Sequence, residues 1–132
     1  MILLDTDVLL DVALGRSMES GDLLRFLEVA PIGAFVAWHT LSNFYYVFRP
    51  VGGGRLAKDF LVDLTEFVTV APTNTDSLRY AANLPLSDLE DAMQVAAARA
   101  CGAEVIATRN VRDFAKSPIR ARTPKQLLAE LV

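Results

Sequence analysis

The residues best suited to chemistry are aspartates that stand next to apolar segments. Asp5 follows the apolar run Ile2-Leu3-Leu4 directly, and an acid at the end of a buried strand needs a partner. Asp88 and Asp91 are three residues apart in a predicted helix, so they share one face of it. Two carboxylates this close repel each other unless a cation lies between them. These aspartates are therefore candidates for binding a metal ion or an arginine.

Asp113 adds a fourth carboxylate after another apolar run, and Asn110 and Thr108 precede it closely. Carboxylate and amide oxygens suit Mg²⁺ or Mn²⁺, whereas zinc prefers histidine and cysteine. The chain has one histidine, His39, and one cysteine, Cys101, which cannot build a zinc site. The predicted cofactor is therefore Mg²⁺ or Mn²⁺, with His39 in a capping or packing role and Cys101 packed in the core.

Several of these acids also have a purely structural explanation, because carboxylates are stabilised at helix N-termini. Asp5 and Asp88 lie at or near predicted helix starts, and Asp7 is predicted to cap the first helix, with Thr6 as the alternative cap. Asp11, one turn further on, is predicted to lie beside the site. For Asp5 and Asp88 the structural explanation and the metal-binding one both stay open.

Three further features have structural explanations from the sequence alone. Asn110 can cap a short helical turn in which Asp113 is an early acid. Ser87 and Glu90 have the spacing of a capping box, which explains Glu90 without a role in the site. The aromatic residues are predicted to pack in the core: Trp38, Phe44, Tyr45 and Tyr46.

Alternating strands and helices must position these residues. The apolar patterns predict strands at 2–4, 34–38, 68–70, 104–107 and 118–121. They predict helices at 8–14, 20–29, 41–48, 55–67, 75–83, 88–100 and 123–131, with a glycine loop at 52–54 and a helix stop near Pro50. This alternation predicts an α/β fold with a central parallel sheet and helices on both faces. Ligands of such folds bind at the carboxyl ends of the strands, where Asp5 lies.

The composition favours a single domain of 132 residues, 52% of which are hydrophobic. The formal net charge is −3, but six of the thirteen lysines and arginines fall between residues 109 and 125. This distribution indicates an acidic pocket beside a basic flank, or else a solvated basic tail. One cysteine excludes an intrachain disulfide, and the N-terminal apolar run is too short to span a membrane, so we expect a cytoplasmic protein.

Four segments, in this order along the chain, resemble the PIN-domain family, in particular its VapC-type toxins. They are residues 3–11, 88–94, 106–114 and 122–128. The resemblance covers essentially the whole chain and implies one PIN domain over residues 1–132, folded as a three-layer α/β/α sandwich. It also implies a Mg²⁺- or Mn²⁺-dependent endoribonuclease, a toxin that a cognate antitoxin neutralises, and a homodimer with no membrane contact.

Carried over by position, the resemblance makes Asp5, Asp91 and Asp113 metal-binding and catalytic acids, and Asp88 is a conditional fourth. The supporting residues would be Thr6, Asn43, Thr108 and Asn110, and the expected RNA contacts would be Arg109 and Arg112.

One position departs from the family pattern. Asn43 stands where the second motif normally places a glutamate, and an amide brings no charge. We hypothesise that Asp88 supplies the missing charge. The alternative is a catalytically impaired PIN module that binds RNA or a protein partner.

Two other enzyme classes fit the sequence less well. The spacing Asp5-Thr6-Asp7 is that of haloacid-dehalogenase-like phosphatases, but Leu9 stands where that family has threonine or valine, and no matching lysine is obvious. A phosphorylation receiver domain would need an acid directly after the third strand, at Val70, and Ala71 follows there.

Overall fold

Five parallel strands form the central layer of the protein, in a computed structural model that describes residues 1–132. Their order across the sheet is β3-β2-β1-β4-β5, so β1, the strand that precedes Asp5, lies at its centre. The strands are β1 (Ile2–Leu4), β2 (Ala34–Val36), β3 (Val68–Val70), β4 (Val105–Ala107) and β5 (Arg120–Arg122).

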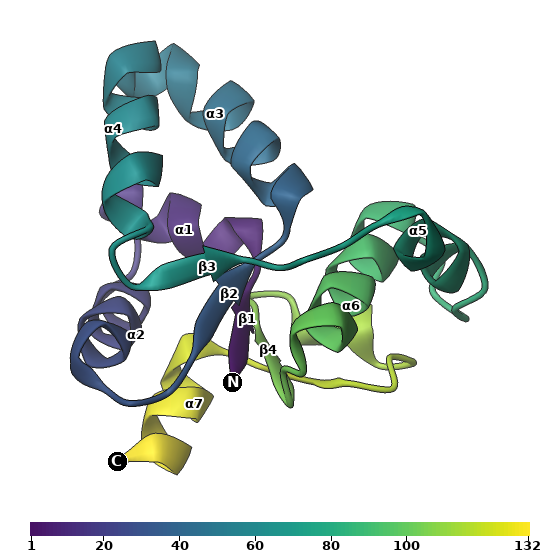
Figure 1. Ribbon diagram of the computed structural model, residues 1–132. Helices are drawn as coiled ribbons and strands as arrows, with labels where there is room; N and C mark the ends of the chain where they lie inside the picture. The colour runs from purple at the N-terminus through teal and green to yellow at the C-terminus, as the bar shows by residue number, and fades with distance from the viewer.

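Helices cover both faces of this sheet because successive side chains of a strand point to opposite sides. In β1, Ile2 and Leu4 belong to one core cluster and Leu3 to another. The helices that contribute to the first cluster are α1 (Thr6–Ala13), α2 (Met18–Val29), α3 (Trp38–Gly52), α4 (Gly54–Leu64) and α7 (Pro124–Leu131). On the other face lies α6 (Leu89–Cys101), with α5 (Thr75–Ala82) packed against it (Figure 1). The predicted three-layer α/β/α architecture is confirmed.

The strand order reverses at β1, and this reversal creates the place for a site. Leu3 of β1 pairs with Phe35 of β2 on one side and with Ile106 of β4 on the other. The chain moves outward from β1 to β3 and then returns across β1 to begin β4. Just past β1, the backbone N–H of Asp5 donates to the carbonyl of Ala107, at 2.9 Å. In such sheets ligands bind at the carboxyl ends of the strands where the order reverses.

Helix α3 is longer than predicted because a proline does not stop it. Pro50 lies in its last turn, where the missing N–H removes one helical hydrogen bond. Phe44 stacks on Phe48 of the same helix and on Phe60 of α4, with ring centroids 5.4 and 4.8 Å apart. These contacts pack α3 against α4 and stabilise α3 as a helix through Pro50. The predicted glycine loop shrinks to Gly53, whose φ of 86° favours glycine.

The prediction that the aromatic residues are core residues is wrong for two of them. Phe44 is fully buried and Tyr45 packs against the core, but Trp38 is 70% and Tyr46 63% exposed. Trp38 was also predicted as the end of a strand, whereas β2 ends at Val36 and Trp38 begins α3.

The other elements lie where they were predicted, with ends shifted by up to three residues, and a short 3₁₀ helix, η1 (Val111–Phe114), follows β4. None of the helices is both long and apolar enough to cross a membrane.

Candidate functional site

Asp5 lies at the centre of the candidate site, between β1 and α1. It is itself the N-cap of α1, because its Oδ1 accepts a hydrogen bond from the backbone N–H of Thr6, at 2.7 Å. The predicted caps, Thr6 and Asp7, instead begin the helix. Oδ1 also accepts from Nε2 of Gln94, at 3.1 Å, and Oδ2 accepts from the hydroxyl of Thr108, at 2.9 Å. Burial, and then the charge of Asp7, raise the pKa of Asp5 to about 7.

Gln94 joins three elements of the site and is not among the residues that the sequence motifs mark as site residues. Its side chain is fully buried, and Nε2 lies within hydrogen-bond distance of Asp5 Oδ1, of Thr40 Oγ1 at 2.9 Å and of Glu90 Oε1 at 3.3 Å. Thr40 also accepts from the hydroxyl of Thr6, at 3.3 Å. A glutamine on the buried, alanine-rich face of α6 was the available signal, since such a side chain needs polar partners.

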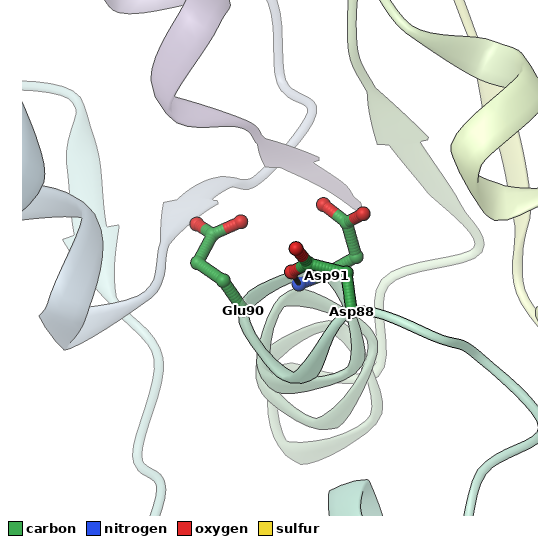
Figure 2. Close-up of side chains that lie close together, drawn as sticks. All are labelled: Asp88, Glu90 and Asp91. Carbon is green, nitrogen blue, oxygen red and sulfur yellow. Dashed lines mark hydrogen bonds between the residues drawn. The ribbon is translucent and has the colours of Figure 1, made fainter.

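Three carboxylates gather at the N-terminal end of α6, and we call Asp88, Glu90 and Asp91 the acidic cluster. One oxygen of each lies within 4.8 Å of the others (Figure 2). Asp88 is the N-cap of α6 and accepts from the backbone N–H of Asp91, at 3.0 Å. The carboxylate of Asp91 accepts no hydrogen bond from a protein N–H or O–H group. Burial raises its pKa to about 7, with further contributions from the charges of Asp88, Glu90 and Asp113.

Glu90 does not form the predicted capping box. Asp88, and not Ser87, caps the helix, so the carboxylate of Glu90 is turned elsewhere. Its Oε1 lies 3.2 Å from Nε2 of His39 and 3.3 Å from Nδ2 of Asn43, both on α3. The hydrogen bond with His39 is the main cause that lowers the pKa of Glu90. His39, predicted to cap or pack, thus contacts an acid of the site. Glu90 lies in the site as well, although its spacing from Ser87 predicted only a capping role.

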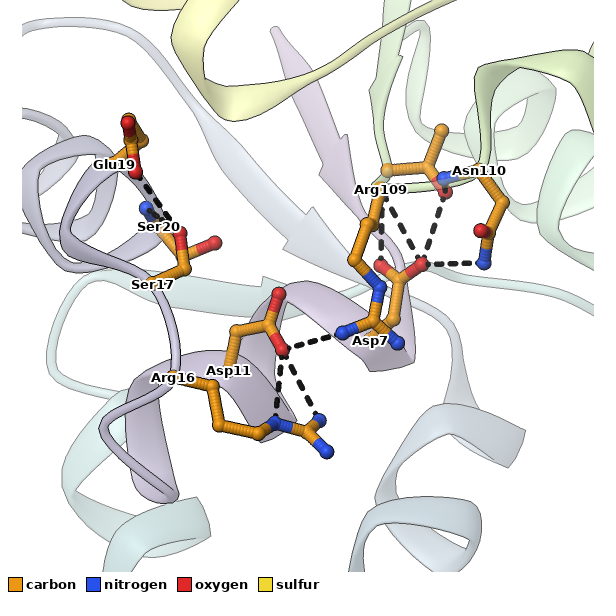
Figure 3. Close-up of polar contacts among 9 residues, drawn as sticks. Asp7, Asp11, Arg16, Ser17, Glu19, Ser20, Arg109 and Asn110 are labelled. Carbon is orange, nitrogen blue, oxygen red and sulfur yellow. Dashed lines mark hydrogen bonds and ion pairs between the residues drawn. The ribbon is translucent and has the colours of Figure 1, made fainter.

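On the other side of Asp5, two acids of α1 have many donors, and we call Asp7 and Asp11 the paired acids (Figure 3). Asp7 accepts from the backbone N–H of Arg109, at 3.2 Å, and from Nδ2 of Asn110, at 3.1 Å. The hydroxyl of Thr108 lies 3.3 Å from it. Burial raises the pKa of Asp7, and the N–H and the charge of Arg109 oppose that rise. Asn110, predicted as a helix cap, makes no cap hydrogen bond and binds Asp7 instead.

Asp11 is 3% exposed and forms ion pairs with two arginines. Its Oδ1 lies 2.7 Å from Nη1 of Arg109 and 3.1 Å from Nη2 of Arg16. The guanidinium groups are about half exposed, so each arginine keeps part of its hydration. Arg109 therefore clamps α1 to the end of β4 with both its backbone and its side chain.

Several cations of the basic flank, residues 109–125, are already engaged in ion pairs. Arg109 pairs with Asp11, while Arg120 and Arg122 pair with Glu130. Arg112 is exposed and forms no ion pair.

Asp113 is exposed in η1, next to Arg112, and its charge contributes to the raised pKa of Asp91. It lies outside the group whose oxygens fall within 4.8 Å of one another.

The donor set fits a hard divalent cation. Asp5 and the acidic cluster offer carboxylate oxygens, and burial together with the neighbouring acids raises the pKa of Asp5 and of Asp91 to about 7, so a cation would stabilise their ionised forms. Oxygen ligands suit Mg²⁺ and Mn²⁺. The site has no cysteine, and its one histidine is engaged with Glu90.

A sequence model of the PIN domain matches residues 1–112 of the chain. The chain belongs to the PIN-domain family. No curated protein sequence matches this PIN domain.

Solved structures share its fold at low sequence identity. A chain of a toxin–antitoxin complex from Klebsiella pneumoniae is 22% identical, with a TM-score of 0.71 over 94% of this chain and 98% of that one. VapBC2 of Rickettsia felis, bound to a DNA fragment from its promoter, is 14% identical, with a TM-score of 0.74 over 93% and 98%. VapC20 of Mycobacterium tuberculosis, a toxin that cleaves the sarcin–ricin loop, is 18% identical, with a TM-score of 0.63 over 80% and 87%.

Proposed function

We propose that this PIN domain, residues 1–132, is a Mg²⁺- or Mn²⁺-dependent endoribonuclease and the toxin of a toxin–antitoxin pair. The observation that carries the proposal is the excess of carboxylates around Asp5 where the strand order reverses. The similar folds include a toxin that cleaves the sarcin–ricin loop and a toxin–antitoxin complex, which supports RNA as the substrate and an antitoxin as the partner.

In this proposal Asp5, Asp91 and the neighbouring acids Asp88 and Asp113 hold the metal. A bound divalent ion would supply a Lewis acid for the scissile phosphate and lower the pKa of an attacking water. Asp5 is prepared for this role because Thr6, Gln94 and Thr108 fix both of its oxygens.

The basic flank would contact the phosphates of the RNA. Arg112 is exposed and has no ion-pair partner, so its guanidinium is available to a phosphate. Arg109 is half exposed but bound to Asp11, and its main contribution would be to fix the end of β4 beside Asp5. Cleavage would leave a 5′-phosphate and a 3′-hydroxyl.

The test is RNA cleavage by purified protein with Mg²⁺ or Mn²⁺ and with chelator. Asp5→Asn keeps an N-cap that can accept from Thr6, because asparagine caps helices as well as aspartate does. We expect this variant to lose metal-dependent cleavage, while Asp63→Asn, the same change at an exposed position of α4, cleaves like the wild type. Cleavage by Asp5→Asn at the wild-type rate would place the activity elsewhere or in a contaminant.

The antitoxin and the homodimer are separate parts of the proposal. A candidate antitoxin, taken from a small gene beside that of this chain, should form a stable complex on co-expression, and this complex should cleave RNA more slowly than the isolated chain. Light scattering on the isolated chain should give the mass of two copies, and a mass of 14.4 kDa at micromolar concentration would exclude the homodimer.

A further inference from the structure

Asn43 is the uncharged member of the site on α3, and its amide is directed at a carboxylate of another helix. Nδ2 of Asn43 donates to Oε1 of Glu90, at 3.3 Å, across 47 residues of sequence. The position on α3 thus provides a hydrogen-bond donor, and the negative charge beside it comes from α6.

The N–H donors to Glu90 all converge on one of its two oxygens. Nε2 of His39, Nδ2 of Asn43 and Nε2 of Gln94 lie 3.2, 3.3 and 3.3 Å from Oε1. No N–H group of the protein donates to Oε2, and the carboxyl group of Asp91 is a further hydrogen-bond partner of Glu90. The carboxylate is therefore fixed in orientation by α3 and α6, and its second oxygen keeps its lone pairs for another ligand.

The fixed carboxylate also lies close to the other acids of the site. Nε2 of Gln94 lies within hydrogen-bond distance of both Glu90 Oε1 and Asp5 Oδ1, so one amide group links the two carboxylates. Glu90 is within 4.8 Å of Asp88 and Asp91 as well, on the side of α6 that faces β1 and α1 (Figure 2). The charges of Asp88 and Asp91 repel that of Glu90 at this separation. A hydrogen bond to His39 alone would therefore be a weak reason for a third carboxylate here.

We propose that Glu90 supplies the carboxylate that Asn43 lacks and binds the metal through Oε2, with Asn43 and His39 as positioning residues. This inference rests on the proposed metal-dependent function. It assigns the compensating charge to Glu90, whereas the sequence suggested Asp88, because Glu90 is the acid that Asn43 contacts.

Mn²⁺ titration by calorimetry tests the assignment without measuring cleavage. Glu90→Gln preserves the shape of the side chain and removes its charge, and we expect it to weaken Mn²⁺ binding about 10- to 100-fold. Glu28→Gln, the same change at an exposed position of α2, should bind like the wild type. In the double variant Asn43→Glu with Glu90→Gln, the charge moves to α3 and most of the affinity should return.

The outcomes separate this inference from the proposed function. If the wild type binds Mn²⁺, Asp91→Asn does not, and Glu90→Gln binds as tightly as the wild type, Glu90 has only a structural role and the inference is wrong, while the metal site stands. If the wild type binds no Mn²⁺ at millimolar concentration, both fail. Should Glu90→Gln fail to fold by circular dichroism, Glu90→Met removes the carboxylate and keeps the length of the side chain, and unchanged affinity there would also overturn the inference.

Discussion

The acids on the two sides of Asp5 differ in what neutralises them. The paired acids, Asp7 and Asp11, accept hydrogen bonds and ion pairs from the end of β4 and from Arg16. The acidic cluster has no arginine or lysine among its partners, and Asp91 has no N–H or O–H donor for its carboxylate. The paired acids have their partners within the protein, whereas the carboxylate of Asp91 has neither a cation nor an N–H or O–H donor there.

This difference points to two different roles for chemically similar acids, one in holding the fold together and one in the proposed binding of a metal. The paired acids attach α1 to the segment after β4, which keeps the ends of β1 and β4 together. Within the acidic cluster, burial and the charges of Asp88 and Glu90 disfavour the ionised form of Asp91, whereas His39 favours the ionised form of Glu90. We therefore expect these similar aspartates to divide into a structural pair and a metal-binding group.

The largest expected effect is the loss of metal binding in Asp91→Ala. Removing a carboxylate of the acidic cluster should weaken Mn²⁺ binding about 100-fold or more, since ligand charge sets the affinity of such sites. The same variant should unfold at an equal or higher temperature than the wild type in chelator, because repulsion from Asp88 and Glu90 is relieved. Calorimetry and thermal unfolding measure the two effects. A large fall in the unfolding temperature in chelator would show that Asp91 stabilises the metal-free protein, as Asp7 and Asp11 are expected to do.

The second prediction concerns pH in the absence of metal. The pKa values of Asp5 and Asp91 are about 7 in the folded protein and near 3.8 ordinarily, so folding takes up protons between these values. The stabilisation is complete below about pH 4 and is lost as the pH rises through about 7. We expect the free energy of unfolding to fall by about 2–4 kcal/mol from pH 5 to pH 8, with most of it due to the more buried Asp5.

Denaturant titrations in chelator at several pH values measure this slope. Asp5→Asn should flatten it, whereas the exposed substitution Asp63→Asn should leave it unchanged. Saturating Mn²⁺ should stabilise the wild type more at pH 8 than at pH 5, because protons compete with the metal for the carboxylates. A slope that Asp5→Asn leaves intact would show that other groups cause it.

The sequence was sufficient for the features that depend on local pattern. The apolar run before Asp5 predicted both a buried strand and an acid at its carboxyl end, and the strand–helix alternation predicted the parallel sheet. Asp88 and Asp91 were placed together correctly because a spacing of three residues fixes one helix face. Their metal-binding roles stay predictions.

The features that the sequence did not predict depend on contacts between distant segments. Glu90 had a complete local explanation in its spacing from Ser87, but Asp88 wins the N-cap position and frees Glu90 to meet α3. Asn110 likewise leaves its predicted cap role because Asp7 lies within reach of its amide. Pro50 failed as a helix stop because packing between α3 and α4 outweighs one lost hydrogen bond.

The third prediction tests the paired acids with Asp11→Ala. The substitution leaves Arg16 and Arg109 without their shared partner, but both guanidinium groups are half exposed and can be hydrated. We expect the free energy of unfolding to fall by about 1–3 kcal/mol, the range for hydrogen bonds to charged groups. Urea unfolding measures the loss, and Mn²⁺ affinity should stay at the wild-type value. This is the reverse of the pattern expected for Asp91→Ala.

The smallest expected effect is that of Asn110→Ala, which removes one of the donors to Asp7. Asn110 is exposed, and Asp7 keeps the backbone N–H of Arg109, so the loss should be about 0.5–1 kcal/mol in urea unfolding. Mn²⁺ binding should not change, because Asp7 is held by the protein and lies outside the acidic cluster. A tenfold weaker affinity would mean that Asp7 takes part in binding the metal. The division between the two sets of acids would then have to be drawn at Asp11.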